Sequence, residues 1–417
     1  MNKIEKIVYD RVKNSPALKF ALRNIYQMAF DLLPTPKNFS IHPIMAKEGY
    51  FYGFHDCSPF SEDETMLLAH HTTIPVRMPR KDEGLEVGYF DFSEAGIGDF
   101  HPLGESFAWN YHKGCRLQWL DGEHVIFNSA QEGKPVAIVA DMNGNVQRKL
   151  PVAVDAVSKD GLWATSFSYE RLNVLMPGYG YEGIADDGHL GECAPDGTGL
   201  SLVDIRTGEC SSVASLHDLC ASVKGEDVSS YKHFVTHTEF SPNGRYLSFL
   251  HRWIGEDYRR RYSRMGIYDR KNDCLSFLDT TGMVSHYVWN NRNQIVAYCS
   301  VREGDAHVLF DVENGTYKPI CLGQLNVDGH QSMVSDSVFV TDTYPDRRRM
   351  ASLYKVDAER QTFEKIASLY SPRKFQTKDF RKHIACDLHP RVSPSGRYVC
   401  FDSVFTGVRS LCVMSLK

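Results

Sequence analysis

Two stretches of the sequence decide the fold because they repeat each other. Residues 237–250 read HTEFSPNGRYLSFL and residues 389–402 read HPRVSPSGRYVCFD. Each copy has a histidine, then a Ser-Pro-x-Gly turn, then alternating apolar residues, which is the pattern of two strands joined by a tight turn. The copies lie 389 − 237 = 152 residues apart, or about three units of roughly 50 residues. A period of this length, built from short strands, is typical of a β-propeller.

Short strands and turns continue from about residue 50 to the end of the chain and divide into seven blades. The third blade carries a long insertion, about residues 169–198, rich in Gly, Tyr and Asp. The last blade has three strands, so we expect residues 38–45 to supply its outer strand, because an open ring would expose a sheet edge. The sequence therefore predicts an all-β, seven-bladed β-propeller over residues 38–417.

The N-terminal extension, residues 1–37, has a different pattern. Apolar residues within 2–33 recur at helical spacing with Lys and Arg between them, which predicts an amphipathic helix. Such a helix could pack on the propeller or a protein partner, or rest on an anionic membrane. We favour the first interpretation because Glu5, Asp10 and Asp31 dilute the basic face.

Composition limits the class of protein. The chain has 417 residues, of which 42% are hydrophobic and 24% charged, as in soluble globular proteins. A formal charge of −5 argues against a nucleic-acid partner. No apolar run is long enough to span a bilayer, and the N-terminus lacks the apolar core of a secretory signal. Eleven cysteines without a CxxC pair indicate free thiols in a reducing compartment, so we expect a cytoplasmic protein.

Histidines recur at one place in the predicted blades. Six stand near the start of a predicted inner strand: His55, His112, His237, His286, His330 and His389. The first strand of a propeller blade lines the central axis, so these side chains should converge. Clustered imidazoles stay neutral because protonated rings repel, and neutral imidazoles suit a divalent transition metal. The third blade has no such histidine, but its insertion carries Tyr179 and Tyr181.

Arginines stand beside these histidines in the sequence. Arg116 follows His112, Arg252 follows the first repeat, and Arg391 follows His389. Guanidinium groups bind carboxylates in bidentate fashion. Grouped with histidines and tyrosines at one end of the ring, they indicate a pocket for an acidic ligand.

Several segments together resemble a known family, the oligogalacturonate-lyase and ulvan-lyase type of seven-bladed propeller. The resemblance covers about residues 50–417 and rests on six segments: AWNYHKGCRLQWL (108–120), MPGYGY (176–181), HTEFSPNGRYLSFLHRW (237–253), SHYVW (285–289), DGHQSMVSDSVFVTDTYPD (328–346) and CDLHPRVSPSGRYVCFD (386–402). The Ser-Pro-x-Gly turn is common among propellers, whereas DGH, DTYPD and DLHPR in this order are more specific.

The resemblance implies a metal-dependent lyase that cleaves uronate-containing glycans by β-elimination. It implies a divalent ion, manganese or zinc, held by His286, His330, His389 and Gln331. It also implies His237 or a tyrosine of 176–181 as the base and Arg252 as the group that neutralises the uronate carboxylate.

The remaining candidates are assigned by their place beside these residues. We expect Tyr179, Tyr181 and His112 in the catalytic set. His55, Arg116 and Arg391 would contact the substrate, an acidic oligosaccharide or polysaccharide.

Two other functions are compatible with the sequence. The chain could be a non-catalytic propeller that binds glycan or protein in surface-polysaccharide assembly, because fold does not imply function. It could also be a glycoside hydrolase, which needs two carboxylates about 5 to 9.5 Å apart. The candidates are Asp56, Glu239, Asp342 and Asp387, and no spacing argument pairs them.

Overall fold

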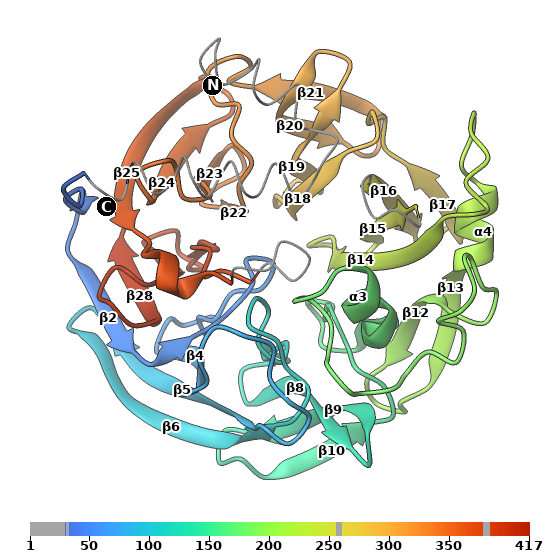
Figure 1. The fold of residues 1–417 in the computed structure, drawn as a ribbon, viewed down its shortest axis with the longest axis horizontal. Coiled ribbons are helices and arrows are strands. Elements are labelled where there is room, and N and C mark those ends of the chain that lie inside the picture. The colour runs from blue at the N-terminus through green and yellow to red at the C-terminus, as the bar shows by residue number, and fades with distance from the viewer. Residues whose placement is uncertain (1–29, 31–32, 256–260, 378–383) are drawn as a thin grey trace.

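Seven antiparallel sheets are arranged in a ring in the computed structural model of the protein (Figure 1). The structure describes residue 30 and residues 33–255, 261–377 and 384–417. The predicted all-β, seven-bladed propeller is confirmed. Within a blade most neighbouring strands follow one another in the chain and pair antiparallel.

The first three blades contain eleven strands. Blade one comprises β3 (Tyr50–Phe51), β4 (Met66–His71), β5 (Leu85–Ser93) and β6 (Gly96–Ser106). Blade two comprises β7 (Gln118–Trp119), β8 (His124–Gln131), β9 (Lys134–Asp141) and β10 (Val146–Leu150). Blade three comprises β11 (Trp163–Ser166), β12 (Gly199–Asp204) and β13 (Cys210–Ser215).

Blades four to seven follow the same pattern. Blade four comprises β14 (Lys232–Phe240), β15 (Tyr246–Ile254), β16 (Arg261–Asp269) and β17 (Cys274–Phe277). Blade five comprises β18 (Val284–Trp289), β19 (Gln294–Val301), β20 (Gly304–Asp311) and β21 (Thr316–Ile320). Blade six comprises β22 (Gln331–Met333), β23 (Val338–Asp342), β24 (Met350–Asp357) and β25 (Thr362–Tyr370). Blade seven comprises β26 (Arg391–Val392), β27 (Tyr398–Ser403) and β28 (Ser410–Ser415).

The N-terminal part of the described chain closes the ring. β2 (Ile44–Glu48) pairs antiparallel with β28 and becomes the outer strand of blade seven, as predicted. The shorter β1 (Phe39–Ser40) pairs instead with β25 of blade six. The expected outer strand thus lies a few residues later than 38–45, because residues 39–40 pair with a different blade. Blade seven therefore combines strands from both ends of the propeller sequence, which removes its free edge.

The first strands of adjacent blades contact one another near the centre of the ring (Figure 1). The blades themselves are held by apolar side chains between neighbouring sheets. Between blades four and five, for example, Leu250 and Met265 belong to one buried cluster with Tyr287 and Ile295. Burying such side chains contributes about 1.5–3 kcal/mol each, so the rigid blades fix whatever projects from the first strands.

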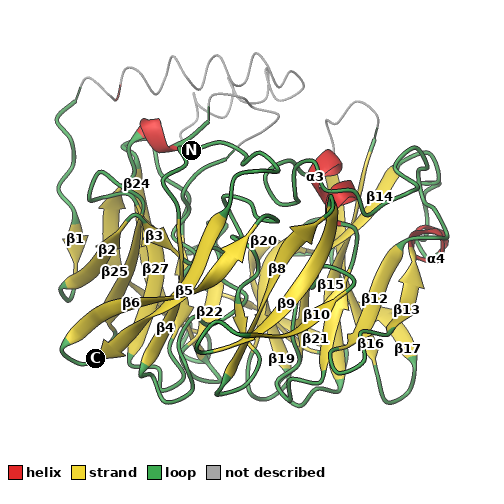
Figure 2. Cartoon of the chain, turned by 90° about the horizontal axis from the view of Figure 1, so that it is seen from below, coloured by secondary structure: helices red, strands yellow, loops and turns green. Residues whose placement is uncertain are grey.

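The long insertion in blade three begins with a helix. α3 (Tyr169–Leu175) starts at Ser168, whose side chain accepts a hydrogen bond from the Arg171 backbone N–H and caps the helix. Tyr169, Leu172 and Leu175 are buried at helical spacing. α3 lies at one face of the ring (Figure 2), so it delivers the Pro-Gly-Tyr-Gly-Tyr segment that follows it to that face.

Two further short helices lie in connections. α4 (Leu216–Ala221) follows β13, and a single 3-10 turn (Arg373–Phe375) follows β25. The predicted N-terminal helix at 2–33 lies outside the described residues. In the described ranges, no helix is both long and apolar enough to cross a membrane.

Candidate functional site

Four of the six predicted histidines occupy equivalent positions in consecutive blades. In blades four to seven, the first hairpin begins at a residue whose backbone N–H donates a hydrogen bond across the turn. These residues are Ser241, Asn290, Val334 and Ser393. A histidine stands four residues earlier in each case: 241 − 237, 290 − 286, 334 − 330 and 393 − 389 are all 4. In blade two the corresponding N–H donor is Leu120, and the residue four positions earlier is Arg116. His112 therefore precedes this register.

The histidines of the two sequence repeats share an unusual backbone conformation. His237 and His389 have φ angles of 53° and 45°, in the left-handed region that side chains other than glycine enter at a cost of about 1–3 kcal/mol. At His237 the pairing register of β14 shifts between Thr236 and Glu239, which is a β-bulge. Bulges re-aim a side chain beside functional sites. The repeated His-x-x-x-Ser-Pro motif thus encodes a local bend that directs each imidazole.

The rings of five predicted histidines come together. The centroid of the His330 ring lies 3.9 Å from that of His286, 4.2 Å from that of His389 and 5.1 Å from that of His55. His237 adjoins this group at 6.0 Å from His286. Their convergence was predicted from the sequence, and the structure brings these five rings together.

An aromatic ring that the sequence did not single out supports the five histidines. The Phe54 ring packs at 4.6–6.0 Å from all five of them. We call the five imidazole rings the histidine cluster.

Several ring nitrogens of the histidine cluster are buried without a hydrogen bond. Nδ1 of His330 lies 2.9 Å from Oδ1 of Asp342. In the neutral ring Nδ1 therefore carries the proton, and Nε2 keeps a free lone pair. Nε2 of His330, Nε2 of His237 and both ring nitrogens of His389 have no partner among the described residues. Buried polar atoms are nearly always satisfied, and a carboxylate behind an imidazole is the usual support of a metal-bound histidine. The donor set therefore fits a divalent transition metal.

Side-chain placement refines this fit. Within the described part of the chain, no three His, Cys, Asp or Glu side chains lie close enough together to form a complete metal site. His286, whose Nδ1 lies 3.4 Å from Oδ1 of Asp328, and His330 form the nearest pair. Binding an ion would thus require small movements of these rings.

Burial sets the charge of the cluster. It is the main cause that lowers the pKa of His237, His389 and His55 well below the ordinary value, and it lowers the pKa of His286 to about 4. Burial also acts to lower the pKa of His330, but the Asp342 carboxylate outweighs it and the pKa is raised. Four of the five imidazoles are therefore neutral at pH 7, which is the metal-binding and proton-accepting form.

Arg252 lies beside the cluster and has no acidic partner among the residues that the structure describes. Its guanidinium donates to Sδ of Met176 and to the carbonyl oxygens of Val284 and Ser285, and Nε has no partner among the described residues. Burial, followed by the nearby charge of Arg261, lowers the pKa of Arg252 to about 9. A buried cation without a counter-ion is costly, so an anion that entered here would be bound strongly.

The other two predicted substrate arginines are engaged inside the fold. Arg116 donates to Oδ1 of Asp56 at 2.7 Å and to the Asp155 carbonyl oxygen. Arg391 pairs with Asp402 at 2.8 Å, and both side chains are fully buried. Both guanidinium groups are buried and paired with carboxylates, so their roles as substrate contacts stay predictions that the geometry does not favour.

Gln331, predicted as an oxygen ligand, is held through the nitrogen of its side-chain amide, and its Oε1 is buried without a hydrogen-bond partner among the described residues. Its side-chain amide donates to Nδ1 of His307 on β20 and to the carbonyl oxygen of Gly329. Its backbone carbonyl oxygen lies 3.0 Å from Nδ1 of His55 instead. Gln331 thus orients a histidine of the cluster through its backbone, while its side chain fills the space toward blade five.

The two tyrosines of the blade-three insertion lie in different places. The Tyr179 ring stacks on His112 with centroids 4.6 Å apart and lies 6.3 Å from His237. The Tyr181 ring stacks on Tyr169 at 4.3 Å, and its hydroxyl accepts a hydrogen bond from Asn128. Tyr179 and His112 therefore border the histidine cluster, whereas Tyr181 belongs to the core.

We expect the conservative substitutions Y179F and Y181F to separate these roles. Y179F should lower any activity on an acidic glycan by about 10²-fold or more, since it removes a proton-transfer group. Y181F should leave activity intact and lower the free energy of unfolding by about 1 kcal/mol, because it removes one buried hydrogen bond. Steady-state rates and thermal melting measure the two effects. If both variants kept the rate of the unchanged protein, Tyr179 would have no role in the chemistry.

Sequence reasoning missed residues that support the cluster. Besides Phe54, they include Asp328, which faces His286, and Tyr344, whose ring lies 5.9 Å from His330. Asp328 and Tyr344 stand in the DGH and DTYPD segments, so the signal was present as polar residues flanking a predicted ligand. Asp342, considered as a hydrolase carboxylate, is instead held by His330.

The comparisons with known proteins agree with this architecture. No family model and no curated protein matches the chain. The solved structure of an oligogalacturonate lyase in complex with manganese aligns with a TM-score of 0.59 at 14% identity, covering 92% of this chain and 99% of that one. An oligogalacturonate lyase from Vibrio parahaemolyticus aligns with a TM-score of 0.58 at 13% identity, covering 91% and 96%. The chain thus has the seven-bladed propeller fold of the oligogalacturonate lyases that its sequence resembles.

Proposed function

We propose that the protein is a metal-dependent lyase that cleaves uronate-containing glycans by β-elimination. The single observation that carries the proposal is the set of buried imidazole nitrogens without hydrogen-bond partners in the histidine cluster. His286, His330 and His389 would hold the ion, with Asp342 and Asp328 supporting two of these rings. The chemistry that a divalent ion supplies when bound is positive charge beside the uronate carboxylate.

The protein's own residues suit the remaining steps. The C5 proton of a uronate is weakly acidic, and its removal builds negative charge on the adjacent carboxylate. Arg252, which forms no ion pair within the described ranges, would bind that carboxylate, and electrostatic stabilisation of this kind usually contributes more to catalysis than any other single effect. His237 is neutral, and its free Nε2 would accept the C5 proton.

The leaving group needs a proton donor. Burial is the main cause that raises the pKa of Tyr179, so its hydroxyl keeps its proton at neutral pH and suits the role of an acid rather than a base. As the C5–H bond breaks, the C4–C5 double bond forms and the C4–O bond breaks, and Tyr179 would protonate the departing oxygen. The acid and the base come from neighbouring elements, the blade-three insertion and β14.

The proposal includes the cellular setting and the ligand. The ligand would be an acidic oligosaccharide or polysaccharide, since a buried unpaired arginine and neutral histidines favour an anion. All eleven cysteines are free thiols, which supports a reducing, cytoplasmic setting.

A second candidate function is a non-catalytic propeller that binds glycan or protein partners. It is favoured by one observation, that no complete three-residue metal site is preformed in the described residues. Arg252 and the neutral imidazoles could then bind an acidic sugar without cleaving it.

A spectroscopic assay separates these functions. Incubation with oligogalacturonate and manganese should produce near-ultraviolet absorbance, because β-elimination creates a double bond conjugated to the carboxylate. The signal should disappear with a chelator and return when manganese or zinc is added. Chain shortening without absorbance would indicate a hydrolase, and sugar binding without shortening would indicate the non-catalytic candidate; either outcome contradicts the lyase.

A further inference from the structure

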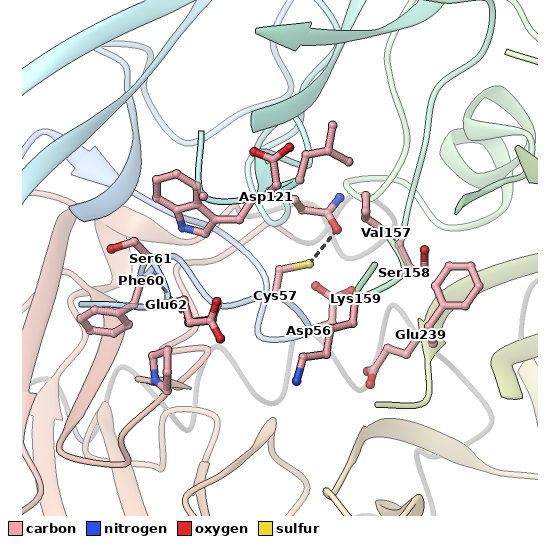
Figure 3. Close-up of a pocket in the computed structure, with 18 residues that line it drawn as sticks. Asp56, Cys57, Phe60, Ser61, Glu62, Asp121, Val157, Ser158, Lys159 and Glu239 are labelled. Carbon is pink, nitrogen blue, oxygen red and sulfur yellow. Dashed lines mark hydrogen bonds between the residues drawn. The ribbon is translucent and has the colours of Figure 1, made fainter. Parts of the chain in front are cut away.

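A pocket of about 480 Å³ lies beside the first hairpin turns of several blades (Figure 3). Its walls come from blades one, two, three, four and seven, at or next to the first hairpin turns, where Ser61, Leu120, Ser158 and Pro394 stand. The histidine cluster stands before those turns along the chain, and none of its five rings lines this pocket. The pocket is therefore separate from the proposed lyase site.

The lining of the pocket is acidic. Its charged residues are Asp56, Glu62, Asp121, Glu239 and Lys159. The lining thus has four carboxyl groups and one ammonium group. A pocket whose walls carry mostly one sign of charge concentrates ligands of the opposite charge. The charge favours a cation.

One carboxylate oxygen in this pocket is buried without a partner. The Asp56 side chain is 3% exposed, and its Oδ1 accepts a hydrogen bond from Arg116 at 2.7 Å. Its Oδ2 is buried and has no hydrogen-bond partner in the described part of the chain. Leaving such an oxygen unsatisfied is costly, so a hydrogen-bond donor supplied by a ligand would be stabilised there.

Glu239 is the second carboxyl group at the same wall (Figure 3). It forms no ion pair within the described ranges, because the nearby Arg116 guanidinium is shared between Asp56 and Asp155. Burial, and then the like charge of Asp56, raises the pKa of Glu239 well above the ordinary value. A carboxyl group in this setting gains strongly from a cation placed beside it.

The size and the walls favour an organic cation over a metal ion. A volume of about 480 Å³ falls in the range of small-molecule sites, and Trp119 and Phe240 contribute aromatic surface of the kind that attracts ammonium groups. No three potential metal ligands of the described chain converge here.

We propose that this pocket binds a small organic cation whose primary ammonium group lies between Asp56 and Glu239. The ammonium N–H groups would donate to Oδ2 of Asp56 and to the Glu239 carboxyl group, and the alkyl part would lie against Trp119 and Phe240. The site carries no reaction and is independent of the lyase proposal.

Isothermal titration calorimetry with 1,5-diaminopentane tests the proposal, with 1,5-pentanediol as an uncharged probe of the same shape. We expect saturable binding of the diamine and none of the diol. The variant E239Q should weaken diamine binding by about tenfold or more, the loss expected when a charge-assisted hydrogen bond is removed. The matched variant E62Q, which changes a carboxylate elsewhere in the lining, should change affinity by less than about threefold.

The controls make the result decisive. E239Q keeps the shape of a protonated glutamic acid, so its melting temperature should match that of the unchanged protein. Equal binding of the diol, unchanged diamine affinity in E239Q, or preferential binding of calcium over the diamine would each overturn the proposal. Near-ultraviolet lyase activity, measured in the same samples, reports on the other site and should be the same in E239Q.

Discussion

Replacing His389 with alanine will remove bound divalent metal and lyase activity and leave the propeller folded. Both ring nitrogens of His389 are buried without a hydrogen bond in the described structure, so the variant breaks no hydrogen bond of the side chain. Alanine keeps the Cβ atom, so the strain of the backbone held at a φ of 45° stays in the variant. The variant removes one of the three proposed metal ligands, the His389 ring, whose centroid lies 4.2 Å from that of His330.

The measurement is the metal content of the purified protein beside its rate. We expect about one ion per chain in the unchanged protein, well under one in H389A, and a fall in rate of about 10³-fold or more. H101A is a matched control, because His101 is exposed and paired with Asp91 at the rim of blade one. Full metal content in H389A would refute the ligand assignment, whatever happens to the rate.

Asp342 gives an independent check of the same site. D342N removes the charge behind His330 and keeps the size of the side chain, but its NH2 group cannot accept a hydrogen bond as Oδ2 does from the His389 N–H. Outer support of this kind typically changes metal affinity by about 10–100-fold, so D342N should need more added manganese for half-maximal activity and recover at high manganese. A rate that no manganese concentration restores would place Asp342 in a different role.

The fold was predictable because several features of the sequence recur with the length of a blade. The Ser-Pro-x-Gly turn, the alternating strands and the return of the same motif after about three blades each point to one architecture. The ring closure was also predictable, because a blade with three strands needs a fourth. The closing strand, β2 at 44–48, was displaced because residues 39–40 pair with β25.

The histidine cluster was predictable for the same reason. The position of each histidine relative to the first turn of its blade decides which of them the repeat could place. His237, His286, His330 and His389 share one position before the first turn, which the sequence reveals once the turns are aligned. His112 stands before that position, yet its ring lies near the cluster, where it stacks on Tyr179. That contact depends on how the blade-three insertion folds back, which no periodic pattern encodes.

The arginines show what the sequence could not separate. Arg116, Arg252 and Arg391 all stand close to a histidine in the chain, yet their surroundings differ. Which arginine has an acidic partner can depend on residues far away in sequence, as with Arg116 and Asp56, which are 60 residues apart. Charge pairing inside a closed ring is a long-range property, so proximity to a motif was not sufficient.

The variants R391A and R252A should therefore have opposite effects. Arg391 donates to Asp402 at 2.8 Å and to the Gly53 carbonyl oxygen, and Asp402 also accepts from the Gly53 N–H. R391A therefore breaks a buried ion pair within blade seven and a hydrogen bond from that pair to blade one. Removing one member of such a pair costs about 3–5 kcal/mol, and R391A should melt well below the unchanged protein yet keep its rate per folded molecule. R252A should melt close to the unchanged protein and lose about 10²–10³-fold in rate. Thermal melting by circular dichroism, with rates measured at low temperature, distinguishes them. A stable but inactive R391A would restore its predicted role as a substrate contact.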